Sequence, residues 1–75
     1  MRLSEGKKGN RYKVNKIGLD AAVVRRLYTL GMTEGTQISV LNSKKLGPMI
    51  INIRGTRFAL GKNFCDEILV EEEVL

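Results

Sequence analysis

The side chains that could carry catalytic chemistry are few in this chain and lie mostly near its C-terminal end. The sequence contains no histidine, one cysteine and eight acidic residues. Cys65 has no histidine to remove its proton, which is more typical of a core residue than of a nucleophile. Asp66 and Glu67 are neighbours, as are the acids at 71–73, and neighbours on a strand point to opposite faces. Neither set forms a facing carboxylate pair, so we expect the protein not to be an enzyme.

Metal and phosphate chemistry have equally little support in the sequence. A ferrous ion needs imidazole, carboxylate or thiolate ligands that converge on one point, and those residue types are scarce here. The basic segment Gly6-Lys7-Lys8-Gly9 lacks the longer glycine-rich loop that ends in lysine and serine or threonine before a helix. It is more typical of a polar turn. We therefore expect no metal site and no cofactor.

Charge is distributed unevenly along the chain. Thirteen basic and three acidic residues give positions 1–65 a net charge of +10, whereas five acids and no base give positions 66–75 a net charge of −5. The positive charge of positions 1–65 favours an acidic partner. Such a partner is an acidic protein surface, a nucleic acid or a membrane with anionic lipid headgroups. The alternative is the ordinary solvated surface of a small domain.

Two basic segments are candidate partner-binding sites. Arg25 and Arg26 lie in the middle of a predicted helix, where they form either a basic anchor for an acidic patch or a solvated helix surface. Lys44, Lys45 and Leu46 lie in a predicted loop at 42–48, beside a rigid Gly-Pro pair. Binding residues concentrate on loops held by a rigid scaffold, so this loop is the preferred contact site. Its alternative is a plain hairpin loop.

These residues are positioned by short elements, most of them strands. Apolar and polar residues alternate in five segments, which predicts strands at 11–17, 36–42, 49–54, 57–60 and 68–72. We predict a helix at 20–30, a short helical turn within 61–67 and a lead-in at 1–8 that is either loose or paired at a sheet edge through Arg2-Leu3. Five strands with one helix after the first suggest a mainly β, partly open small barrel, which hides strand edges. The 75 residues are expected to form one domain, residues 1–75.

The predicted helix has recognisable signals at both ends. Asp20 precedes it and supplies a carboxylate that accepts the free N–H groups of the first turn. Gly31 follows it and suits the left-handed residue that ends a helix. Val24, Leu27 and Tyr28 recur at helical spacing and are predicted to form its buried face.

Two turns and one aromatic residue complete the prediction. The segment 33–36 is typical of a type II turn with Gly35 at the position that requires a positive φ. Gly55-Thr56 is predicted to be a two-residue hairpin turn. Phe64 is expected to point inward from the short helical turn.

Two blocks of sequence resemble the ferrous iron transport protein A family, FeoA. The first block is R-R-L-x-x-L-G-M-T-x-G-T-x-I-x-V, running from Arg25 to Val40. The second comprises Leu46-Gly47-Pro48, Ile53-Arg54-Gly55 and Phe58-Ala59-Leu60. Glu34 departs from the pattern, since family members often carry proline there, but Gly35 still provides the special dihedral angle. The resemblance implies an SH3-like barrel, in agreement with the strand count.

The same resemblance implies a function. A FeoA-like protein is a non-catalytic cytosolic accessory protein of bacterial ferrous iron uptake that binds and regulates the FeoB permease, in particular its G-protein domain. No apolar run is long enough to span a bilayer, so we expect a cytoplasmic protein that reaches the inner face of the cell membrane only through FeoB.

The alternative is a basic SH3-like module that binds nucleic acid. The charge of positions 1–65 supports it, but all four aromatic residues fall at predicted core positions, which leaves no stacking platform. The first interpretation is therefore binding to FeoB, with no nucleic-acid partner expected.

Overall fold

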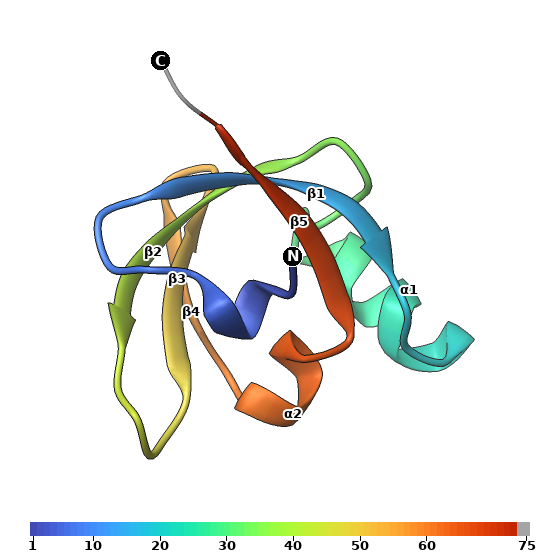
Figure 1. Cartoon of the computed structure of the whole chain (residues 1–75). Coiled ribbons are helices and arrows are strands. Elements are labelled where there is room, and N and C mark those ends of the chain that lie inside the picture. Colours follow the sequence, from blue (N-terminus) through green and yellow to red (C-terminus); the bar gives the residue numbers. More distant parts are fainter. Residues whose placement is uncertain (74–75) are drawn as a thin grey trace.

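The structure, a computed structural model, describes residues 1–73 (Figure 1). The predicted order of strands and helices is confirmed within this range. The elements are η1 (Leu3–Glu5), β1 (Arg11–Ile17), α1 (Ala21–Thr29), β2 (Gln37–Ser43), β3 (Met49–Ile53), β4 (Thr56–Leu60), α2 (Lys62–Cys65) and β5 (Ile68–Glu73). The strands form one antiparallel sheet in the order β4-β3-β2-β1-β5. The fold is mainly β, with α1 directly after the first strand.

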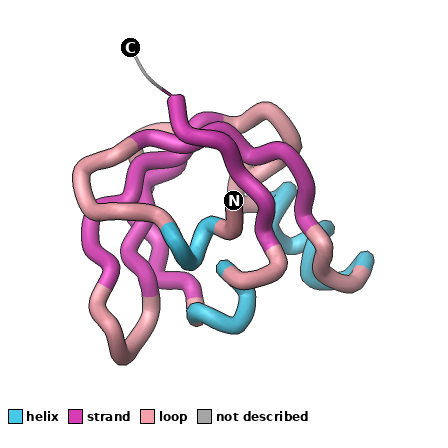
Figure 2. Tube along the Cα trace, in the orientation of Figure 1, coloured by secondary structure: helices cyan, strands magenta, loops and turns pink. Residues whose placement is uncertain are grey.

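The sheet is strongly curved, and its strands wrap around the interior (Figure 2). The register shifts between Val14 and Lys16 where β1 meets β5, and between Val40 and Asn42 where β2 meets β3. Such irregularities bend a strand and increase its twist. Every second residue lines the concave face up to these shifts: in β1 Tyr12 and Val14 are buried, and beyond the shift Ile17 packs on the core.

The core consists of aliphatic residues from the inner faces of the strands, closed by residues from the helices. Its buried strand residues are Tyr12, Val14, Ile38, Val40, Met49, Ile51, Ile53, Ile68 and Val70. The hydroxyl of Tyr12 keeps a polar partner, because it accepts a hydrogen bond of 2.8 Å from the backbone N–H of Lys7. Few aromatic residues are present, so branched aliphatic side chains supply most of the buried apolar surface.

The predicted signals at the ends of α1 are confirmed. Oδ1 of Asp20 accepts a hydrogen bond of 3.1 Å from the backbone N–H of Val23. Gly31 adopts a φ of +98°, and the N–H of the buried Met32 donates to the carbonyl of Leu27 across the helix end. The chain then turns as expected at Gly35, whose φ is +87°.

The prediction for two aromatic side chains was wrong. Tyr28 is 47% exposed and Phe64 is 44% exposed. Helix α1 packs on the core through Val23 and Leu27, four residues apart, which leaves Tyr28 at the rim. Helix α2 has only four residues, and Cys65 occupies its buried position.

The prediction of a loose lead-in was also wrong, whereas its alternative, pairing at a sheet edge, is confirmed for Arg2. Leu3 is completely buried and belongs to the core. Met1 and Val70 exchange two hydrogen bonds, of 2.9 Å from the N-terminal ammonium to the carbonyl of Val70 and 2.7 Å in the reverse direction. Arg2 pairs with Leu69, so the first residues run beside β5 (Figure 1).

The hairpin between β3 and β4 turns one residue earlier than predicted. Ile53 pairs with Thr56, so the two turn residues are Arg54 and Gly55. Both have positive φ, of +52° and +82°, which is the geometry of a type I′ turn. The N–H of Gly55 also donates to the side-chain oxygen of Asn52 at 2.9 Å.

Candidate partner-binding surfaces

The loop that contains Lys44, Lys45 and Leu46 lies at the tip of the β2–β3 hairpin. All three residues are exposed, and Leu46 is 87% exposed, the highest value among the exposed large hydrophobic residues of positions 1–73. Gly47 takes a φ of +107°, which directs the chain into Pro48 and the start of β3. The loop thus presents an apolar side chain between two cations and a conformationally restricted Gly-Pro pair.

Arg25 and Arg26 form a second exposed surface on α1. With Ala22 and Thr29 they line a shallow hollow of about 360 Å³. The hydroxyl of Thr29, which lines the hollow, donates a hydrogen bond to the backbone carbonyl of Arg25 and so already has a partner within the helix. Both guanidinium groups remain available to a carboxylate partner, for which their planar donor array is suited.

These two surfaces do not lie together. The loop is at the lower end of β2 and β3 in Figure 1, whereas α1 lies on the right-hand side of the molecule. The structure therefore offers two separate candidate contact areas.

Part of the basic surface is neutralised within the fold, which the sequence alone did not reveal. Strand β5 brings the C-terminal acids beside the bases of β1, with Arg11 opposite Glu73 and Lys13 opposite Glu71. Nζ of Lys13 lies 3.5 Å from a carboxylate oxygen of Glu71. The acidic strand β5 thus screens β1, and basic residues without an opposite acidic strand are found on α1, on β4 and in the loops.

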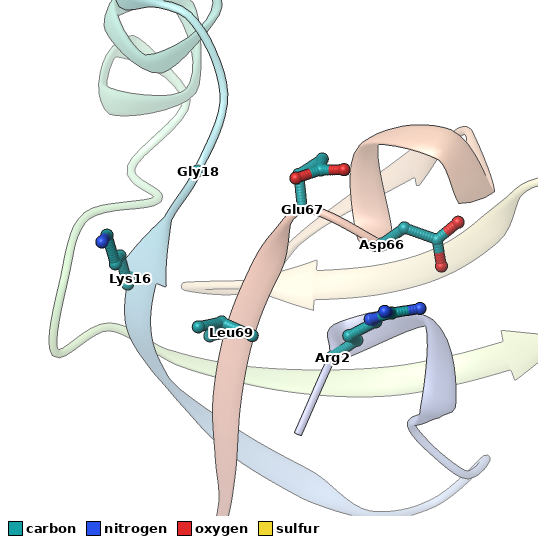
Figure 3. Close-up of a pocket in the computed structure, with 6 residues that line it drawn as sticks. All are labelled: Arg2, Lys16, Gly18, Asp66, Glu67 and Leu69. Atoms are coloured by element: carbon teal, nitrogen blue, oxygen red, sulfur yellow. The ribbon is translucent and has the colours of Figure 1, made fainter.

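A mixed-charge hollow of about 410 Å³ lies over β5, between β1 and the N-terminal segment. Two bases, Arg2 and Lys16, and two acids, Asp66 and Glu67, line it together with Leu69 (Figure 3). Arg2 and Asp66 extend on one side of Leu69, and Lys16 lies on the other. Because its charges balance, this hollow has no strong preference for a cation or an anion.

The cysteine and the acidic residues are the side chains whose grouping and reactivity decide what chemistry the described residues support. Within residues 1–73, no three His, Cys, Asp or Glu side chains are grouped closely enough to hold a metal ion. Burial raises the pKa of the Cys65 thiol from 9.0 to about 11, with a further contribution from Asp66 and an opposing one from Lys62. A thiol with such a pKa is protonated and weakly nucleophilic at neutral pH. No helix in the same range is long and apolar enough to cross a membrane.

Comparison with known proteins finds relatives along nearly the whole chain. A curated relative from Methanocaldococcus jannaschii, provisionally named Fe(2+) transport protein A, is 30% identical and covers 93% of this chain and 84% of its own. A crystal structure of an iron uptake regulatory protein, FeoA, is 34% identical with a TM-score of 0.90 and covers 97% of each chain. Stenotrophomonas maltophilia FeoA in complex with zinc, described as an SH3 domain protein, is 28% identical with a TM-score of 0.81 and covers 95% of this chain and 89% of its own.

The family model gives the same result. The five-stranded curved sheet with α1 after its first strand is the SH3-like fold expected from the sequence. The model of the FeoA domain matches residues 1–72, a range that includes both sequence blocks and the N-terminal segment that closes the core. The chain belongs to the FeoA family.

Proposed function

We propose that the protein is a non-catalytic cytosolic accessory protein of ferrous iron uptake. It binds the FeoB permease at its cytosolic G-protein domain and reaches the inner face of the membrane through that contact. The family match over residues 1–72 carries the proposal. The names of relatives support it: one is named for Fe(2+) transport, another for iron uptake regulation, and a third has a suggested role as a transport activating factor.

The proposed contact uses the exposed loop of Lys44, Lys45 and Leu46, with Arg25 and Arg26 as a second area. Leu46 supplies an apolar anchor, and its lysine neighbours supply charge that steers an acidic surface into place. Regulation follows when the protein binds one conformation of FeoB more tightly than another.

An NMR titration of the isotope-labelled chain with the purified G-protein domain of FeoB tests this proposal. We expect shifts at residues 42–48 and about tenfold weaker binding for the double variant Lys44→Glu, Lys45→Glu. The matched control is Lys7→Glu, Lys8→Glu, which makes the same charge change in another exposed turn. Equal loss in both variants would show general electrostatic attraction and would contradict a specific loop contact. The variant Arg25→Glu, Arg26→Glu tests the second area in the same way.

Binding of nucleic acid is the second candidate, and the exposure of Tyr28 and Phe64 favours it. These rings were expected in the core, but both are accessible for stacking, and Tyr28 lies one helical turn from Arg25. Titration with a single-stranded oligonucleotide at several salt concentrations separates the two functions. Tight binding that falls steeply with salt and weakens in Tyr28→Ala would favour nucleic acid over FeoB.

A further inference from the structure

Strand β4 is an open edge of the sheet. In residues 1–73 it pairs with β3 alone, whereas the opposite edge strand, β5, is covered by the paired Met1 and Arg2. Five consecutive residue pairs join β4 to β3 without a bulge. The strand also contains no proline, so apart from Arg57 it lacks the features that usually protect a free edge from pairing.

The register shows which backbone groups of β4 are free to pair. The turn Arg54-Gly55 closes on Ile53 and Thr56, and the adjacent pair of a two-residue hairpin is hydrogen-bonded. Hydrogen-bonded and non-hydrogen-bonded pairs then alternate along the strand. The N–H and C=O groups of Arg57 and Ala59 therefore point away from β3, and both residues are exposed.

An apolar groove of about 250 Å³ runs along this free edge. It is lined by Leu27 of α1 and by Leu30, which directly follows that helix, by Ala59 and Leu60 of β4, and by Phe64 of α2. Consecutive residues of a strand face opposite sides of the sheet, so a hollow that touches both Ala59 and Leu60 passes around the strand edge. Its volume is below the usual range for small-molecule pockets, about 300–1,000 Å³, and suits a few side chains of a polypeptide.

The charge around the groove is positive. Arg26 lies in its lining, which contains no acidic residue, and Arg57 is two residues from Ala59 on the same outward face. An occupant with carboxylates complements these cations. In the described chain, the strand that combines acids with apolar residues is β5, which is already paired on both sides. A second copy of this chain is therefore not the expected occupant.

We propose that an extended segment of a partner protein, with alternating acidic and apolar side chains, adds to β4 as a strand. The segment lies between β4 and α1, where its backbone pairs with Arg57 and Ala59. Its apolar side chains contact Leu30 and Phe64, which are otherwise 43% and 44% exposed, and its carboxylates face Arg26 and Arg57. Strand addition of this kind takes affinity from main-chain hydrogen bonds and specificity from side-chain pockets. This contact is separate from the Lys44–Leu46 loop proposed for FeoB and does not depend on it; it shares only Arg26 with the second proposed area, so the Ala59 variants, which leave Arg26 unchanged, distinguish the two.

Synthetic peptides test the proposal on the intact protein. The probe alternates glutamate and valine, and two matched peptides carry either lysine in place of glutamate or N-methyl groups on the amides that face the strand. We expect the probe to shift the amide signals of Arg57, Ala59 and Phe64, and the other two peptides to bind about tenfold more weakly or worse. Equal binding of the N-methylated peptide, shifts on another face, or no binding at millimolar concentration would overturn the proposal.

Two variants locate the contact on this chain. Ala59→Pro removes an outward N–H that β3 does not use, a change that edge strands tolerate, and Ala59→Ser keeps that N–H. We expect Ala59→Pro to lose the probe and Ala59→Ser to keep it, while Arg26→Glu should prefer the lysine peptide. Probe binding that survives Ala59→Pro would exclude strand addition.

If Ala59→Pro does not fold, the comparison of the probe with the N-methylated peptide on the unmodified protein decides whether a strand is added. Shifts of the same amides with protein concentration alone would identify a second copy as occupant and overturn the partner assignment.

Discussion

Cys65 shows at the scale of one residue how burial removes reactivity. Its side chain is fully buried, and Sγ lies 3.9 Å from the carbonyl oxygen of Leu60. The sequence predicted a core residue because no histidine is present to activate the thiol, and the buried position confirms it. The direction of its pKa shift was beyond sequence reasoning, because it depends on how many atoms exclude water from the sulfur.

This thiol makes stability sensitive to alkaline pH. The folded protein holds the proton up to a pKa of about 11, whereas the unfolded chain releases it near the ordinary value of 9.0. The unfolded state therefore binds fewer protons between these values, and the free energy of unfolding falls as the pH rises through this window. Urea unfolding near pH 8 and near pH 10.5 measures the loss, which we expect to be smaller in Cys65→Ala. The same loss in both proteins would show that the thiol has no part in it.

At the scale of one element, the ends of α1 could be predicted from its sequence, whereas its buried face depends on the elements packed against it. Asp20 and Gly31 act through local backbone geometry, so both ends of the helix were predictable. The buried face was not, because Val23 and Leu27 are four residues apart just as Val24 and Tyr28 are. In a helix of nine residues, the position of the sheet beneath it selects between these faces.

The β3–β4 hairpin gives a prediction for a single turn. Gly55 has a φ of +82°, and a Cβ added there meets no atom within 4 Å, so only backbone strain opposes a side chain. We expect Gly55→Ala to lower the free energy of unfolding by about 1–2 kcal/mol. Gly61→Ala is the matched control, because Gly61 has a φ of −60° and its added Cβ meets the ring of Phe64 at an ordinary 3.7 Å. Thermal unfolding of both variants measures the contrast, and equal losses would mean that positive φ is not the cause.

At the scale of the whole molecule, the sequence predicted strands well and long-range contacts poorly. Alternation within each strand is local information, and it placed Val14, Ile51 and Val70 correctly in the core. Leu3 stands alone among polar and charged residues, so no periodicity indicated that it would be buried against β5. The separation of Arg26 from Lys44, and the open edge of β4, depend likewise on how the sheet curves.

The two leucines Leu3 and Leu46 therefore make a test of the whole architecture. Both precede or follow charged residues and look alike in the sequence, yet Leu3 is completely buried and Leu46 is 87% exposed. We expect Leu3→Ala to lower the free energy of unfolding by about 2–5 kcal/mol, because it leaves a cavity where η1 packs on β5 and α2. Leu46→Ala should change this free energy by less than about 0.5 kcal/mol.

Urea unfolding measures the free energy of unfolding of both variants. Hydrogen exchange at Val70, whose N–H donates to the carbonyl of Met1, reports whether the N-terminal segment has detached. Equal stability of the two variants would place the first residues outside the cooperative core, since a segment that unfolds separately contributes nothing to the global transition.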